Sequence, residues 1–267
     1  MSETKGSTAP LGLFDSGVGG LSVLQAVRRL LPHENLIYYA DQEYCPYGPR
    51  PADEIRSLSE RVTRFLLAKG CKAIIVACNT ASAAALEHLR STFPAVPFIG
   101  MEPAVKPAAL RSQTGKVGVL ATKGTLEGEL FLRTRDKHAR EVEVLVTYPT
   151  DWVERVERGD IDSPETEESV RRIVQPFLDA GADEIALGCT HYPFLSPLIG
   201  RVANGRAEII DPSQAVARQA ARVLSEHGLL TPGTTEGTRA YYTSGEPAAF
   251  SRLLRKLIGE EQPAAPG

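Results

Sequence analysis

"GCKAIIVACNT" (70–80) runs from a glycine through an aliphatic stretch to Cys78, which is followed at once by an amide and a hydroxyl side chain. "GADEIALGCTH" (181–191) has the same plan, with eight positions from its glycine to Cys189, as in the first segment. A short aliphatic run that ends in polar residues is typical of a buried strand in a parallel sheet. The two segments therefore predict two related α/β halves, each supplying one cysteine.

Short aliphatic runs recur along the chain and alternate with segments of helical length, such as 52–69 and 165–180. The runs cover residues 11–14, 36–40, 73–77, 97–100, 116–121, 141–146, 184–188 and 207–210. This alternation predicts βαβ units and an α/β fold with mainly parallel sheets. Ligands of such sheets bind beyond the carboxyl ends of the strands, so residues directly after each run are the first candidates for a functional site.

A second pair of matching segments supports the duplication. "GLFDSG" (12–17) and "GVLATKG" (118–124) each have a glycine, two apolar residues and, four positions after the glycine, a hydroxyl residue, Ser16 or Thr122. The two matches together predict two related α/β halves.

Proline-rich junctions at 101–108 and 209–216 mark the places where the chain passes between the two halves. The segments after the second junction, including helices predicted at 213–226 and 247–258, are too short for a third domain, so we expect them to complete the first. The predicted organisation is a first domain of 10–102 plus 211–259, a second domain of 103–210, and flexible tails at 1–9 and 260–267.

Composition excludes several classes of protein. Hydrophobic residues make up 42% and charged residues 24% of the 267 positions, the balance of an ordinary globular protein. The net charge of −3 gives no electrostatic reason to expect nucleic acid or an anionic membrane as a partner. The first ten residues lack the apolar core of a signal peptide, and no stretch reaches the length of a membrane span, so we expect a cytoplasmic protein.

Four cysteines, Cys45, Cys71, Cys78 and Cys189, form no C-x-x-C pair, and no histidine cluster has the spacing of a zinc site. We expect free thiols and no metal or cofactor. Cys71 is interpreted as a small buried hydrophobic residue. The same interpretation competes with a chemical role for Cys78 and Cys189.

Two thiols facing each other across a cleft have a specific chemical use. The pKa of an unperturbed cysteine is ~8.5, and a helix N-terminus with nearby donors lowers that pKa towards neutrality. Asn79 and Thr80 follow Cys78, and Thr190 and His191 follow Cys189, so such donors are present. One thiolate would remove a proton from carbon while the opposite thiol returns one, which inverts a stereocentre without a cofactor.

Two further loops carry candidate ligand contacts. In "LFDSGVGGLSVL" (13–24), Asp15 and Ser16 follow an aliphatic run, and the glycines let backbone N–H groups approach a ligand. As the ligand of this loop, a small anion such as a carboxylate is favoured over a nucleotide, because a Walker lysine and a G-x-G-x-x-G pattern are both missing. The alternative is that the loop is a tight turn with a structural role alone. Tyr47 and Gly48, set between prolines, indicate a rigid loop that presents a backbone N–H.

Four motifs in this order, "GLFDSGVGGLSVL", "YCPYGPRP", "VACNTASA" and "LGCTHYP", resemble those of the glutamate racemases of the aspartate/glutamate racemase superfamily. "VGVLATKGTL" (117–126) and "IDPSQAVA" (210–217) are similar to that family too. The resemblance implies a cofactor-independent racemase of two pseudo-symmetric α/β domains, with the active site in the cleft between them. It also implies that Cys78 and Cys189 are the catalytic acid/base pair. It further implies that the product D-glutamate serves peptidoglycan synthesis and that a homodimer is possible.

The resemblance also implies roles for the motif residues. Asp15 would assist Cys78 and His191 would assist Cys189; the substrate-binding positions are Asp15, Ser16, Tyr47, Gly48, Asn79, Thr80, Thr122, Thr190 and His191. The family's assisting glutamate corresponds to either Glu157 or Glu154. Glu157 is favoured because it keeps the Glu-x-Gly ending of the family motif. The stretch departs from the family pattern at Tyr148, which replaces a cysteine that is usual there. Cys45 is also unusual for the family and is interpreted as non-catalytic.

Other functions are compatible with the same residues. The same two thiols would suit a racemase for aspartate or another small anionic amino acid. Cys189 with His191 would suit a thiol hydrolase, which leaves Cys78 unexplained. A ligand-binding protein, or a metal site made of Cys78, Cys189 and His191, is a further alternative.

Overall fold

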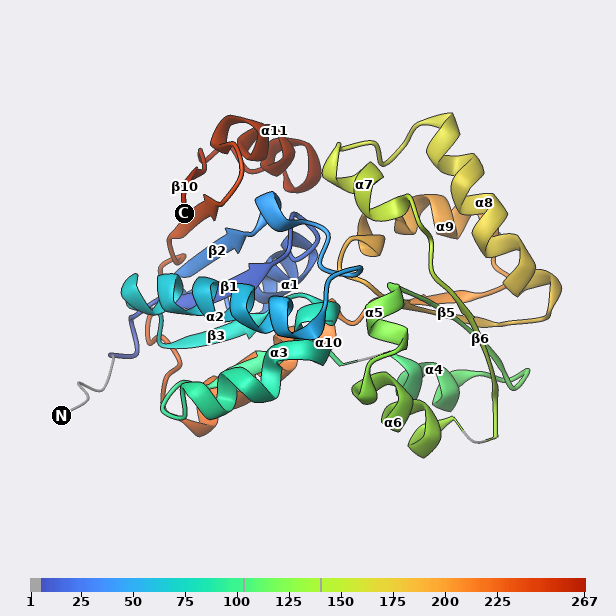
Figure 1. Ribbon diagram of the computed structural model, residues 1–267, viewed down its shortest axis with the longest axis horizontal. Helices are drawn as coiled ribbons and strands as arrows, with labels where there is room; N and C mark the ends of the chain where they lie inside the picture. Colours follow the sequence, from blue (N-terminus) through green and yellow to red (C-terminus); the bar gives the residue numbers. More distant parts are fainter. Residues whose placement is uncertain (1–5, 103, 140) are drawn as a thin grey trace.

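The structure is a computed structural model that describes residues 6–102, 104–139 and 141–267, and it contains two lobes, each built on a β-sheet (Figure 1). The first sheet has the strand order β10-β9-β2-β1-β3-β4 and the second β6-β5-β7-β8. The first comprises β1 Leu11–Asp15, β2 Leu36–Ala40, β3 Ala73–Val76, β4 Phe98–Gly100, β9 Arg239–Thr243 and β10 Ala265–Pro266. The second comprises β5 Lys116–Ala121, β6 Glu143–Thr147, β7 Glu184–Gly188 and β8 Glu208–Ile210. Each strand pairing in the described residues is parallel, so the predicted α/β fold with mainly parallel sheets is confirmed.

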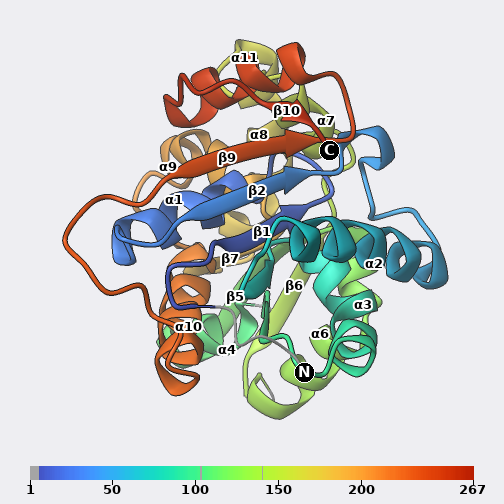
Figure 2. The same ribbon diagram turned by 90° about the vertical axis from the view of Figure 1, so that its left-hand side faces the viewer.

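Helices cover both faces of each sheet. The first lobe holds α1 Leu21–Leu30, η1 Gln42–Tyr44, α2 Ala52–Ala68, α3 Asn79–Thr92, α10 Ser213–Glu226 and α11 Pro247–Ile258. The second holds α4 Val105–Arg111, α5 Lys123–Leu126, α6 Glu129–His138, α7 Trp152–Glu157, α8 Pro164–Asp179, η2 Tyr192–Leu195 and α9 Ser196–Ala203. In the first lobe α1 packs against α10 and α2 against α3, and Figure 2 shows these two pairs on opposite sides of the sheet.

Strand residues alternate between two apolar clusters because successive side chains of a strand point to opposite faces. Leu13 and Tyr38 belong to the cluster that contains α1 and α10 residues. Phe14 and Tyr39 belong to the cluster formed with α2 and α3. Both faces of the sheet are therefore buried, which explains why these strands are continuous apolar runs in the sequence.

Local signals in the sequence set several helix ends. Ser163 precedes α8, and its Oγ accepts a hydrogen bond from the backbone N–H of Thr166 (3.2 Å), as an N-cap serine does. Glu246 caps α11 in the same way, through bonds from two backbone N–H groups. Gly259 ends α11 with φ of +67°, a left-handed conformation that glycine adopts without strain.

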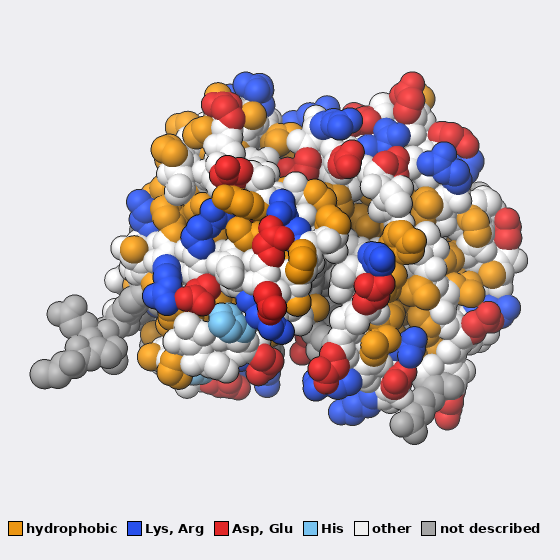
Figure 3. Space-filling model, viewed as in Figure 1, with side chains coloured by type: hydrophobic (Ala, Val, Ile, Leu, Met, Phe, Trp, Pro, Cys, Tyr) orange, Lys and Arg blue, Asp and Glu red, His pale blue; other side chains and the backbone are white. Residues whose placement is uncertain are grey.

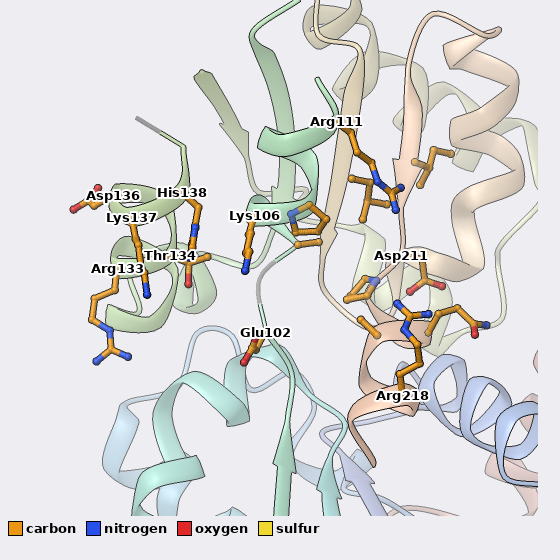
Figure 4. A pocket seen from close by; sticks show the side chains of 17 residues that line it. Glu102, Lys106, Arg111, Arg133, Thr134, Asp136, Lys137, His138, Asp211 and Arg218 are labelled. Atoms are coloured by element: carbon orange, nitrogen blue, oxygen red, sulfur yellow. The ribbon is translucent and has the colours of Figure 1, made fainter. Parts of the chain in front are cut away.

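The chain passes from the first lobe to the second between β4 and α4 and returns between β8 and α10. A cavity of about 1220 Å³ lies beside these two crossings (Figure 4). Its charged lining residues are Glu102, Lys106, Arg111, Arg133, Asp136, Lys137, Asp211 and Arg218. The predicted boundaries near 102 and 210 fall at these crossings and remain a prediction; residue 103 lies outside the described residues.

Residues 260–267, which the sequence predicts to be a flexible tail, are hydrogen-bonded to the first sheet in the structure. β10 pairs with β9, and the backbone N–H of Gly267 donates to the carbonyl of Thr243 (2.9 Å). Glu260 accepts hydrogen bonds from Arg239 (2.9 Å) and from the hydroxyl of Tyr241 (3.0 Å). These bonds attach the segment to the edge of the first sheet. Of the tail predicted at 1–9, residues 1–5 lie outside the described residues.

The surface carries charges of both signs. Figure 3 shows acidic and basic side chains interspersed over one face, and the outline is notched between the two lobes. Among the helices of the described ranges, none is both long and apolar enough to span a bilayer.

Candidate active site

The carboxyl ends of strands from both lobes meet at one small cavity. Asp15 ends β1, Cys78 follows β3 after one intervening residue, and Cys189 and Thr122 directly follow β7 and β5. The cavity is lined by Ser16, Pro46, Tyr47, Gly48, Cys78, Asn79, Thr80, Thr122, Val153, Cys189, Thr190 and His191. The structure therefore brings together almost all the side chains singled out from the sequence; Asp15 and Glu157 lie behind this lining and contact it.

The cavity is nearly closed. Its volume is about 10 Å³, the space of about one water-sized sphere. Sites for small molecules usually have ~300 Å³ or more. An amino acid therefore needs the lining residues to move apart before it can enter.

Cys78 lies at the N-cap of α3, with the extended backbone that this position requires. Its Sγ accepts a hydrogen bond from the backbone N–H of Ala81 (3.5 Å) and lies 4.0 Å from Oγ of Ser16. Burial raises the pKa of Cys78 well above its usual value, and the nearby Asp15 raises it further; the bond from Ala81 only partly opposes them. The expectation that the helix N-terminus lowers this pKa is thus wrong for the closed site, because desolvation outweighs the helix.

Asp15 is fully buried and holds the β1–α1 turn together. Its carboxylate accepts hydrogen bonds from the backbone N–H groups of Ser16 and Gly20, both at 2.7 Å. The hydroxyl of Thr190, from the other lobe, donates to it at 3.2 Å. Burial raises the pKa of Asp15, although His191 and the hydrogen bonds oppose this. Asp15 therefore links the two lobes directly beneath the cavity.

Cys189, His191 and Glu157 form a chain of contacts. Nδ1 of His191 lies 3.7 Å from Sγ of Cys189, and its Nε2 lies 2.6 Å from Oε1 of Glu157. Burial lowers the pKa of the imidazole, but contacts with both thiols, those of Cys189 and Cys45, and with Glu157 raise it by more, so it lies well above the usual value. The chain therefore holds the imidazole against the Cys189 thiol.

Glu157 is held by groups from the first lobe as well. Its carboxylate accepts hydrogen bonds from the backbone N–H of Val18 (2.7 Å) and from the amide of Gln42 (3.0 Å). Burial raises the pKa of Glu157, but His191 and these two bonds lower it by more, so the pKa is below its usual value. Glu154, the other candidate, is at the surface and pairs with Arg158 (3.6 Å). The structure thus brings Glu157, and not Glu154, to the site.

Hydroxyl and amide groups line the rest of the cavity. Oγ1 of Thr80, in the first lobe, lies 2.9 Å from Oγ1 of Thr122, in the second, so the two hydroxyls bond across the cleft. Oδ1 of Asn79 is buried and has no hydrogen-bond partner among the described residues. A buried acceptor without a partner is costly, so this oxygen is suited to receive a donor from a ligand.

The chain matches the profile of the Asp/Glu/Hydantoin racemase family over residues 20–220. It belongs to this racemase family. A glutamate racemase of Roseiflexus sp. strain RS-1 is 49% identical over 252 residues, which cover 94% of this chain and 93% of the relative.

Two solved structures of glutamate racemases have the same fold. The Escherichia coli protein, in a complex with L-glutamate, superposes with a TM-score of 0.83 at 30% identity, covering 94% of this chain and 96% of that one. The Francisella tularensis protein, in a complex with D-glutamate, has a TM-score of 0.82 at 28% identity and covers 96% of each chain. The resemblance stated from the motifs is therefore confirmed across almost the whole length of this family member.

The structure adds residues that sequence reasoning missed in this racemase. Asp41 is buried and accepts hydrogen bonds from the hydroxyl of Tyr47 and from Arg61, both at 2.5 Å, so it fixes the loop that carries Tyr47 and Gly48. A signal was available for Asp41, because it directly follows the aliphatic run at 36–40. No comparable signal existed for Gln42, whose partner Glu157 is 115 positions away.

One group of potential metal ligands is present in the described ranges. Sγ of Cys45, a carboxylate oxygen of Glu157 and a ring nitrogen of His191 all lie within 4.8 Å of one another. This group differs from the one weighed from the sequence, which combined His191 with Cys78 and Cys189.

Proposed function

We propose that the protein interconverts L-glutamate and D-glutamate, with Cys78 and Cys189 as the two acid/base groups. The observation that carries the proposal is that one thiol from each lobe, each 5% exposed, lines the same small cavity. Each thiol also has a carboxylate nearby. Asp15 lies beside Cys78, and Glu157 contacts His191, which contacts Cys189.

In the proposed reaction one cysteine, as thiolate, removes the proton from Cα. The electron pair left on carbon is delocalised into the substrate's α-carboxylate. The thiol on the opposite face then gives its proton to Cα, so the configuration inverts and the two cysteines have exchanged protonation states. The chemistry needs no electron acceptor, because the proton is the only group transferred.

The polar lining suits the charged groups of an amino acid. Hydroxyls of Ser16 and Thr80 line the cavity and are donors suited to carboxylate oxygens, while Oδ1 of Asn79 is an acceptor suited to an ammonium group. An α-ammonium beside Cys78 would supply the positive charge that favours its thiolate, and would offset the burial that raises its pKa in the closed site.

The proposal is tested by following L- and D-glutamate, beside L- and D-aspartate, by circular dichroism and by NMR of Cα deuterium uptake from D₂O, without cofactor. We expect inversion of glutamate by the wild type and a loss of ~10²–10⁴-fold in the Cys78→Ala and Cys189→Ala variants. Preference for aspartate would instead identify the related racemase. Absence of exchange at Cα of every substrate would exclude the proposal.

The contact chain of Cys189, His191 and Glu157 also favours a second candidate, a thiol hydrolase, because it has the order nucleophile, base and orienting acid. Cys78→Ser separates the two. A hydrolase would keep its activity in this variant, whereas a two-thiol racemase would lose turnover in both directions.

We further infer that D-glutamate made by this enzyme in the cytoplasm serves peptidoglycan synthesis. The inference follows from the family, since the curated relative and both solved structures are bacterial glutamate racemases. A homodimer also remains a prediction, which sedimentation of the purified protein would check.

A further inference from the structure

Cys45, Glu157 and His191 come from three separate parts of the chain and converge beside the active site. Sγ of Cys45 is 3.6 Å from Oε1 of Glu157, and Nε2 of His191 is 2.6 Å from the same oxygen. Gly17 makes this convergence possible: a Cβ atom there would lie 1.8 Å from Oε1 of Glu157 and 3.0 Å from Sγ of Cys45. The space beside the carboxylate oxygen and the sulfur is therefore available because residue 17 has no side chain.

The three donor types select a particular class of metal. A thiol, an imidazole and a carboxylate suit zinc and similar transition metals, whereas magnesium and calcium prefer oxygen ligands alone. Zinc bonds of ~2.3 Å to sulfur and ~2.1 Å to oxygen in a tetrahedral site put those two ligand atoms roughly 3.6 Å apart. The observed distance between Sγ of Cys45 and Oε1 of Glu157 is 3.6 Å.

The imidazole has to move away from the carboxylate. A tetrahedral site needs its nitrogen roughly 3.4 Å from the carboxylate oxygen, against the 2.6 Å of the present hydrogen bond. The group is also within reach of solvent, because Cys45 is partly exposed and the Glu157 side chain is 17% exposed. Cys45 takes no part in the proposed proton transfers, so the reaction leaves the presence of its thiol unexplained.

We propose that Cys45, Glu157 and His191 form a site for Zn²⁺ or a similar transition-metal ion, and that metal binding there inhibits the enzyme. The ion bonds to the sulfur, the Oε1 oxygen and Nε2, with water in the fourth position; the thiol proton of Cys45 and any proton on Nε2 pass to the buffer. His191 then has its Nε2 on the metal in place of the bond to Glu157, and it no longer exchanges a proton freely beside Cys189. The metal site stands on its geometry alone, whereas the inhibition rests on the proposed racemase function.

The test uses Co²⁺, whose bond to a thiolate gives a near-ultraviolet charge-transfer band, titrated into metal-free protein. We expect one Co²⁺ per chain with this band in the wild type, displaced by Zn²⁺. Cys45→Ser, which keeps the size of the side chain, should lose the band and bind at least ~100-fold more weakly, since even the loss of an outer partner costs roughly 10–100-fold. Cys78→Ala is the matched control and should keep the band. Thermal unfolding of both variants verifies that they are folded.

The outcomes separate the site from the function. A wild type without a thiolate band, or a band that persists in Cys45→Ser, overturns the metal site, and neither result depends on activity. For the inhibition, the ratio of racemisation rates with and without Zn²⁺ is compared within each protein: we expect a fall of ~10-fold or more in the wild type and a much smaller one in Cys45→Ser. Equal ratios overturn the inhibitory role, while a protein without racemisation in metal-free buffer contradicts the proposed function instead.

Discussion

Glu157 supports only one of the two thiols, and this asymmetry gives a prediction. Its carboxylate contacts His191, which contacts Cys189, whereas Cys78 is supported from the other side by Asp15. We expect Glu157→Gln to slow turnover by ~10–100-fold and to slow Cα exchange more for the enantiomer that Cys189 deprotonates. Deuterium uptake into L- and D-glutamate, measured separately, checks this.

The surface variant Glu154→Gln is the control for this experiment and should match the wild type for both enantiomers. Equal slowing of the two exchange rates in Glu157→Gln would indicate a merely structural role and contradict the prediction.

Single residues were predictable where chemistry follows a strand. Cys78, Cys189 and Asp15 stand directly beyond aliphatic runs, so their meeting at one edge could be foreseen from the sequence. The raised pKa of Cys78 could not, because it depends on burial by segments from both lobes. Likewise the choice between Glu154 and Glu157 needed the three-dimensional path of α7, since both belong to the same short helix.

The turn between β1 and α1 approaches His191 so closely that position 19 has no room for a side chain. A Cβ atom at Gly19 would lie 2.4 Å from Nδ1 of His191, closer than real Cβ contacts come, so the imidazole has to shift in Gly19→Ala. We expect activity to fall at least ~10-fold while the protein stays folded, because a small misplacement of a catalytic group is costly. Racemisation rate and thermal unfolding are measured together.

Gly200→Ala supplies the control, because a Cβ atom there meets nothing closer than 4.0 Å and the residue lies within α9. This variant should keep full activity and gain roughly 0.5–1 kcal/mol of stability from helix propensity. Full activity in Gly19→Ala would show that the turn has room for the imidazole to adapt.

Elements with a strong apolar period were predictable to within a residue or two. The helix predicted at 213–226 is α10, and the one near 247–258 is α11. β10 was missed, since its proline- and alanine-rich segment has no apolar period and is held mainly through backbone bonds to β9 and neighbouring polar contacts. The pattern of apolar side chains predicts helices and strands that bury one face. It carries no information about a strand that is held in place by backbone hydrogen bonds.

At the scale of the whole molecule, the duplication of motifs predicted two lobes, but their closure depends on contacts between distant residues. The hydroxyl of Ser22 donates to the carbonyl of Thr190 (3.1 Å), 168 positions away, and one apolar cluster contains core residues of both lobes. Such pairs leave no periodic signal in the sequence. The near-closed cavity was therefore visible only in the structure.

Closure also predicts how the buried thiols respond to a probe. Thr122→Ala removes the 2.9 Å bond to Thr80 across the cleft and leaves the longer 3.5 Å contact between Thr80 and Thr125. One such bond contributes about 1 kcal/mol, so the open form should be about fivefold more populated. Alkylation of Cys78 and Cys189, followed by mass spectrometry, should accelerate by that factor, because these thiols react only in the open form. Thr92→Ala, which removes a hydroxyl bond within α3, should leave the rate unchanged; equal labelling in both variants would show that this hydroxyl pair does not hold the lobes closed.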